Sequence, residues 1–130
     1  MIIDDALDQL QLMRTVFKMV DPSLQIVTAG GGDEALNLLR SSSPNLPRVI
    51  LLDLRMPGKT GQEVLAEIKS DSSLRTIPVC TFSNGDVQRD ICECYELGAS
   101  FYFKKPSGLD KLKAFAECFT ELWFKLASHC

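Results

Sequence analysis

The sequence contains one histidine, His129, and no apolar run near the roughly 20 residues that cross a membrane. Its first residues include no basic region ahead of an apolar stretch, so no secretory signal is recognisable. Lysine and arginine total 14 against 17 aspartates and glutamates, a formal charge of −3. The chain therefore lacks the basic excess typical of proteins that bind nucleic acid or anionic membranes. These absences predict a cytoplasmic protein with neither a nucleic acid nor a membrane as its partner.

The cysteines follow no regular framework, although there are five of them: Cys80, Cys92, Cys94, Cys118 and Cys130. Without an export signal, we expect free thiols in a reducing compartment. Cys92 and Cys94 could supply half of a metal site. No second cysteine pair has ligand spacing, and the single histidine lies in the tail, so this alternative is disfavoured.

What is present is the pattern of one globular domain of 130 residues, 45% hydrophobic and 24% charged. Short apolar runs occupy residues 1–3, 24–28, 48–52, 77–82 and 100–103. Amphipathic stretches occupy residues 6–20, 33–41, 61–70, 87–97 and 109–127. Five strands alternating with five helices predict a doubly wound α/β fold, and apolar strands such as 49–52 favour a parallel sheet covered on both faces.

Punctuation residues support these boundaries. Asp33 follows three glycines and is predicted to cap the second helix, and Gly98 is predicted to end the fourth. The last helix carries an apolar stripe that favours core packing, with a partner surface as the alternative. The stripe comprises Leu112, Phe115, Phe119, Leu122, Trp123 and Leu126.

Reactive side chains follow four of the five predicted strands. Asp4 and Asp5 follow the first, Asp53 ends the third, Ser83 ends the fourth, and Lys105 follows the fifth. In a parallel α/β sheet, ligands bind beyond the carboxyl ends of the strands, where these residues would converge. Each residue has a plainer alternative: a helix cap for the aspartate pair, a turn for Asp53, and a solvated loop for Lys105.

Clustered carboxylates require a compensating cation. At 4 Å and an effective dielectric of roughly 20, each pair repels by about 4 kcal/mol. A few oxygen ligands suit Mg2+, which keeps several waters and shares its shell with a phosphate. The Lys105 ammonium and the Ser83 hydroxyl can each contact a phosphoryl oxygen. Together these groups predict a site where a carboxylate becomes an acyl phosphate.

Several segments at these separations resemble the response-regulator receiver domain, the phosphoacceptor half of two-component signalling. They are Ile3-Asp4-Asp5, Leu51 to Gly58 (with Asp53-Leu54-Arg55-Met56-Pro57), Gly61 with Glu63-Val64-Leu65, Ile77 to Ser83, Glu96 to Ala99, and Tyr102 to Pro106. The likeness spans nearly the whole chain and is greatest to stand-alone receivers, including those paired with phytochrome-type kinases. It implies a flavodoxin-like fold with strand order 2-1-3-4-5, and a single receiver domain over residues 1–130 without an output domain.

The same resemblance implies the metal site. Asp53 would be the phosphorylation site, in a reaction that depends on Mg2+. Asp5, Asp53 and the backbone carbonyl of Arg55 would ligate the ion, and Asp4 would act through a metal-bound water.

The resemblance also implies how the protein would respond to phosphorylation. Lys105 would pair with the phosphoryl group, Ser83 would reorient toward it, and Tyr102, the switch aromatic, would move inward. Two positions depart from the commonest pattern: Asn84 is larger than the small residue often found there, and Arg55 could reach over the site. We expect both to alter the lifetime of the phosphoryl group.

The implied function is a phosphorelay switch rather than an enzyme. A sensor histidine kinase or phosphotransfer protein would supply the phosphoryl group, and a downstream partner protein would read the fourth helix, fifth strand and fifth helix. The same face could form a homodimer.

Three alternatives remain. A haloacid-dehalogenase type of aspartyl-phosphate phosphatase is disfavoured because Arg55 stands where such enzymes carry a second acid. A nucleotide-binding module is disfavoured because Gly30-Gly31-Gly32 lacks spaced glycines and a Gly-Lys-Ser/Thr ending. A receiver-like interaction module without phosphotransfer is disfavoured by the intact aspartate, serine and lysine set.

Overall fold

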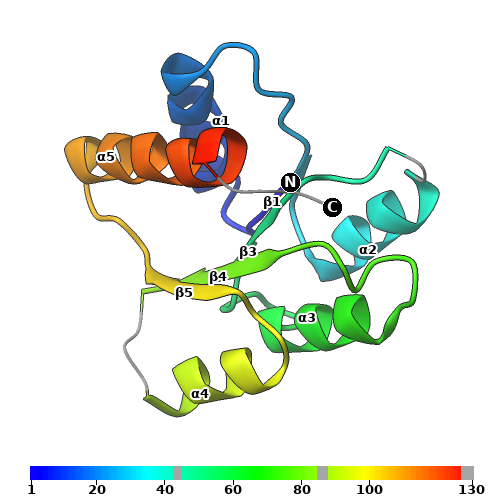
Figure 1. Ribbon diagram of the computed structural model, residues 1–130. Coiled ribbons are helices and arrows are strands. Elements are labelled where there is room, and N and C mark those ends of the chain that lie inside the picture. The colour runs from blue at the N-terminus through cyan, green and yellow to red at the C-terminus, as the bar shows by residue number, and fades with distance from the viewer. Residues whose placement is uncertain (43–44, 85–87, 127–130) are drawn as a thin grey trace.

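The computed structural model describes residues 1–42, 45–84 and 88–126, which form a five-stranded parallel sheet between two layers of helices (Figure 1). The strands are β1 (Ile2–Ile3), β2 (Thr28–Ala29), β3 (Ile50–Asp53), β4 (Val79–Ser83) and β5 (Phe101–Lys104). The helices are α1 (Leu7–Val20), α2 (Gly32–Ser41), α3 (Gly61–Ser70), α4 (Gln88–Glu96) and α5 (Leu109–Thr120), followed by a π-helical segment, η1 (Glu121–Leu126). Within these ranges, no helix has the length and apolar character needed to cross a membrane.

The strand order is β2-β1-β3-β4-β5, which confirms the predicted doubly wound, flavodoxin-like fold. Every residue of β3 and β4 is buried, because both faces of these central strands are covered. In Figure 1, α1 and α5 cover one face, whereas α3 and α4 cover the other. One buried cluster includes Phe17, Leu112 and Phe119 on the α1–α5 side, and the second includes Leu36 and Leu65 on the α2–α3 side.

The second strand is shorter and later than the predicted range 24–28. A turn follows α1, in which the Leu24 N–H donates to the Asp21 carbonyl and the Ser23 N–H donates to the Asp21 carboxylate. This turn occupies the start of the predicted strand, so only Thr28 and Ala29 form β2 and pair with β1.

The predicted cap at Asp33 is wrong. Gly31 occupies the N-cap position of α2 and offers no side chain, and Asp33 lies inside the first turn. The Glu34 carboxylate accepts a hydrogen bond from the Gly30 N–H, so a neighbouring acid supports this helix start. Gly98 does end α4, with φ of +105° and its N–H bonded to the Tyr95 carbonyl.

The last helix, predicted over residues 109–127, is not α-helical over its whole length. The α-helical hydrogen bonding of α5 stops at Thr120, and η1 continues as a wider π-helical turn. Within it Trp123 is buried and contacts Phe101 edge-on, with ring centroids 6.1 Å apart. Core packing is confirmed for Leu112, Phe119 and Trp123, whereas Leu122 is 39% exposed. The predicted residue 127 lies outside the described residues, as does residue 87 at the start of α4.

Candidate functional site

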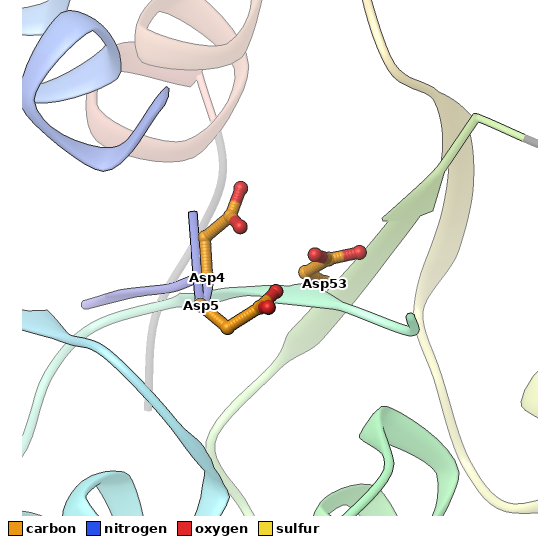
Figure 2. Close-up of side chains that lie close together, drawn as sticks. All are labelled: Asp4, Asp5 and Asp53. Carbon is orange, nitrogen blue, oxygen red and sulfur yellow. The ribbon is translucent and has the colours of Figure 1, made fainter. Parts of the chain in front are cut away.

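Asp4, Asp5 and Asp53 converge at the carboxyl ends of β1 and β3, as Figure 2 shows. These strands are neighbours in the sheet, with Ile3 in register with Leu52, so the residues that follow them meet at one edge. One carboxylate oxygen from each aspartate lies within 4.8 Å of the others. Asp4 and Asp53 are buried, whereas Asp5 reaches solvent. The predicted convergence of the three carboxylates is confirmed.

The two buried aspartates are held in the same way. Asp4 Oδ1 accepts a hydrogen bond from the Ala6 N–H at 3.0 Å, and Asp53 Oδ1 accepts one from the Arg55 N–H at 3.1 Å. Each is a turn in which an aspartate bonds the backbone two residues on. The plainer alternative of a helix cap is wrong for the aspartate pair, because Ala6 occupies the N-cap position of α1 and no side chain caps it. The alternative of a turn is confirmed for Asp53, but it uses only one oxygen of the carboxylate. The second oxygen of each remains for the site.

Lys105 meets those second oxygens. Its Nζ lies 3.3 Å from Asp4 Oδ2 and 3.3 Å from Asp53 Oδ2, and its side chain is only 12% exposed. The Lys105 N–H donates to the Ser83 carbonyl, which carries the β4–β5 pairing one residue past β5 and fixes the start of this side chain. The ammonium also lies 5.1 Å from the centre of the Phe82 ring. Lys105 is thus a site residue rather than a solvated loop residue.

The site is short of positive charge. Burial raises the pKa of Asp53 to about 6, and the nearby Asp4 charge acts in the same direction, against the lowering effects of the Arg55 N–H and Lys105. Asp4 Oδ2 is close enough to Lys105 for an ion pair but receives no hydrogen bond of good geometry. Three carboxylates facing one ammonium, with a buried oxygen lacking an aligned donor, fit a hard divalent cation.

Ser83 lies on β4, the strand next to β3, and Tyr102 lies on β5, one strand further from β3. Ser83 is buried at the end of β4, in register with Lys104, and one residue beyond Phe82, the partner of Asp53. Tyr102 is partly buried against the core cluster on the α2–α3 side. These positions suit the predicted phosphoryl contact and switch aromatic, whose roles stay predictions.

Arg55 and Asn84, the two residues that depart from the family pattern, differ in their surroundings. The Arg55 guanidinium pairs with the Asp90 carboxylate of α4 at 2.7 Å, while its backbone N–H braces Asp53. Its carbonyl as a metal ligand stays a prediction. Asn84 is exposed directly after β4, and its effect on the site also stays a prediction.

A glycine allows α3 to begin directly against the end of β3. A Cβ on Gly61 would lie 2.4 Å from the Asp53 carbonyl oxygen and 2.5 Å from the Leu54 Cα. The Thr60 capping box fixes the same helix start through Glu63. Only glycine permits this approach, so Gly61 helps to set the backbone position of Asp53.

Sequence reasoning missed three contributors. Phe82 supports Lys105, Asp90 holds Arg55, and the Tyr95 hydroxyl of α4 accepts a hydrogen bond from the Tyr102 N–H. The alternation of β4 could have placed Phe82 beside the site. An acid in a first helical turn, as Asp90 is, looks like an ordinary complement to the helix dipole and gave no signal.

The cysteines form no second centre in the described residues. Cys80, Cys92, Cys94 and Cys118 are free thiols there, and Cys130 lies outside that part of the chain. Cys92 is exposed and Cys94 is buried, so the two do not face a common ion. Within the same residues, the aspartate trio is the group of acids, cysteines or histidines found close enough to hold a metal.

Comparisons with known proteins agree with this geometry. Residues 1–117 match the family model of the response regulator receiver domain. The two-component response regulator ORR4 of Oryza sativa subsp. indica is 34% identical over 128 residues, which cover 85% of this chain and 54% of that relative's length. The response regulator Rcp1 of Synechocystis sp. is 29% identical over 96% of this chain and 88% of its own.

Solved structures share the fold over almost the full chain. The phosphorylated cyanobacterial phytochrome response regulator RcpA superposes with a TM-score of 0.90 at 32% identity, covering 98% of this chain and 94% of that one. The Mn2+-bound form of Rcp1 gives a TM-score of 0.84 at 26% identity, covering 99% and 96%. With its fold, its acidic edge and these matches, the chain belongs to the response-regulator receiver domain family of two-component systems.

Proposed function

We propose that this chain is a phosphorelay switch that accepts a phosphoryl group on Asp53. The observation that carries the proposal is the shared geometry of Asp4, Asp53 and Lys105. Two buried carboxylates each use Oδ1 to brace a loop and present Oδ2 to one ammonium at 3.3 Å. A nucleophilic oxygen, a fixed cation and a further acid beside it are what phosphoryl transfer to a carboxylate requires.

The donor is a phosphohistidine of a sensor histidine kinase or phosphotransfer protein. An Asp53 carboxylate oxygen attacks the phosphorus, a P–O bond forms, and the P–N bond to the imidazole breaks. The departing imidazole nitrogen takes up a proton from water. The return to the resting state breaks the new P–O bond by attack of water and releases inorganic phosphate and the Asp53 carboxylate.

The residues around Asp53 have separate tasks. Lys105 lies where it can pair with a phosphoryl oxygen, and the Ser83 hydroxyl donates to another. Asp5 and Asp53, with the Arg55 carbonyl, would hold Mg2+, and Asp4 would act through a water bound to that ion. When bound, this ion neutralises charge on the transferring group. The Mn2+-bound state of Rcp1, a structural neighbour, supports a divalent ion here.

The signal leaves through a partner protein that reads α4, β5 and α5. Phosphorylation biases a two-state element in which Ser83 turns toward the phosphoryl group and Tyr102 moves inward. Large apolar side chains are exposed on these three elements and on the adjoining η1: Tyr95 on α4, Phe101 on β5, Leu109 on α5 and Leu122 on η1. Exposed apolar groups gathered on adjoining elements suit a partner protein, or a second copy of this chain. Light scattering with and without phosphorylation distinguishes the homodimer from the monomer.

The test is a mass measurement. The protein is incubated with Mg2+ and acetyl phosphate, and its intact mass is followed with time. We expect one phosphoryl adduct that is labile to alkali, absent without Mg2+, and absent in Asp53→Asn. An Asp110→Asn variant, which changes an exposed aspartate of α5, serves as the matched control and should still be modified.

Two other outcomes assign a different function. If neither acetyl phosphate nor a cognate kinase gives an adduct, the chain is a receiver-like interaction module without phosphotransfer. If many phosphate esters are hydrolysed per protein molecule, it is a phosphatase. Decay of the adduct is also compared in Arg55→Ala and Asn84→Ala, since both are expected to change its rate.

A further inference from the structure

The loop that carries the phosphoacceptor is tied to α4 by an ion pair. The Arg55 backbone N–H donates to Asp53 Oδ1 at 3.1 Å, and the guanidinium of the same residue lies 2.7 Å from Asp90 Oδ2. A single residue thus contacts the phosphoacceptor with its backbone and α4 with its side chain. Asp90 is the better buried partner, with a side chain 17% exposed against 61% for Arg55.

The core holds α4 only weakly. Cys94 is the one α4 residue that is buried, whereas Arg89, Cys92, Glu93, Tyr95 and Glu96 are exposed. Near its carboxyl end, α4 is joined to β5 by the hydrogen bond from the Tyr102 N–H to the Tyr95 hydroxyl. In its first turn, it is joined to the loop after β3 by Asp90 and Arg55. With so little apolar burial, polar ties contribute a large share of what positions this helix.

We infer that Asp90 is a positioning residue for the phosphoryl site, which holds the Arg55 guanidinium away from Asp53 and so couples the site to α4. The inference rests on the proposed function, because the competitor for the guanidinium is a phosphoryl group on Asp53. Such a group carries more negative charge than the carboxylate that it modifies and offers oxygens that a guanidinium binds in two-point geometry. The guanidinium lies beside an open hollow lined by Leu54, Met56, Pro57, Thr60 and Gln62, so it has room to move.

The coupling acts in both directions. A phosphoryl group that draws Arg55 away releases the first turn of α4, and a partner that pulls Asp90 away frees Arg55 to bind the phosphoryl group. Linkage requires the two effects to be equal in size. An exposed ion pair of this kind supports a coupling of about 1.5- to 5-fold.

The test uses beryllium fluoride with Mg2+ as a stable mimic of the phosphoryl group. We expect Asp90→Asn to bind it about 1.5- to 5-fold more tightly than the unmodified chain, and Asp90→Glu to restore the original affinity. Amide hydrogen exchange in the first turn of α4, measured without the mimic, should be faster in Asp90→Asn and in Arg55→Gln. Glu93→Gln, which removes an exposed charge from the same helix, is the matched control and should change neither quantity.

The double variant separates positioning from simple charge removal. In an Arg55→Gln background, Asp90→Asn should no longer tighten the mimic, because there is no guanidinium left to release. An unchanged affinity in Asp90→Asn overturns the inference, as does a gain that persists in the Arg55→Gln background. If the unmodified chain does not bind the mimic and accepts no phosphoryl group from acetyl phosphate or a cognate kinase, the proposed function itself fails. If the chain instead binds the mimic with the same affinity whether or not Asp90 is replaced, only the inference about Asp90 fails.

Discussion

Replacing Asp53 by asparagine should stabilise the metal-free protein at neutral and alkaline pH. Burial raises the pKa of this carboxyl to about 6, whereas the unfolded chain keeps an ordinary value near 3.8. The folded state therefore binds the Asp53 proton more tightly than the unfolded state does. Above pH 6 the carboxylate is charged in both states, and its folded environment costs stability that an asparagine amide does not.

The size of the effect follows from the pKa difference. A shift of about two units corresponds to about 3 kcal/mol at most, since each unit is about 1.4 kcal/mol. Asp53 is 2% exposed, but the neighbouring Asp5 reaches solvent, and water near the cluster screens part of the cost. We therefore expect Asp53→Asn to raise the free energy of unfolding by about 1 to 3 kcal/mol at pH 8. The gain should shrink as the pH falls through 6 and vanish below about pH 4.

The assay is urea unfolding followed by circular dichroism, in EDTA, at several pH values between 4 and 8. Asp110→Asn supplies the background for loss of an exposed aspartate. A stabilisation that does not depend on pH, or an asparagine variant less stable than the unmodified chain at pH 8, would refute the reasoning. Added Mg2+ should reverse the order, because an ion that binds only the folded aspartate form stabilises it by mass action.

Three further predictions concern the surroundings of the site. Lys105→Ala leaves Asp4 and Asp53 without their ammonium, so its free energy of unfolding in EDTA should fall by about 3 kcal/mol, and Mg2+ should recover part of the loss in the same urea assay. Gly61→Ala forces a Cβ against the Asp53 carbonyl and should cost about 1 to 3 kcal/mol and slow phosphorylation by acetyl phosphate, whereas Gly31→Ala, in open space, should leave the phosphorylation rate unchanged. A maleimide should modify the exposed Cys92 and Cys118 rapidly but Cys80 slowly, because burial raises the pKa of the Cys80 thiol to about 12; mass spectrometry of peptides checks this, and rapid labelling of Cys80 would contradict it.

The strands that build the site were predictable because their signals are local. Residues 49–52 are uniformly apolar, as a central parallel strand requires, and the acids and the lysine follow such runs directly. Parallel topology then brings strand ends together without further information. The convergence of Asp4, Asp5, Asp53 and Lys105 therefore followed from the sequence once the fold class was known.

What escaped prediction depends on contacts between distant elements. The late start of β2 arises from a turn at Asp21, and the π-helical η1 contains Trp123, which packs against Phe101. The Arg55–Asp90 pair joins residues 35 positions apart. Its formation depends on the rotation of α4 about its own axis, which a helix with a single buried residue specifies poorly.

The two carboxylate oxygens of each buried aspartate have different roles, one in folding and one in function. Oδ1 of Asp4 and of Asp53 satisfies a backbone N–H two residues on, which the side-chain oxygen of asparagine, serine or threonine can also do. Oδ2 of each faces Lys105 and needs a full negative charge to bind a cation or to act as a nucleophile. Asparagine keeps the first task and loses the second, so it should preserve the loop while abolishing phosphorylation. Alanine loses both, so its effects on stability and on phosphorylation cannot be separated, which makes asparagine the informative substitution at either position.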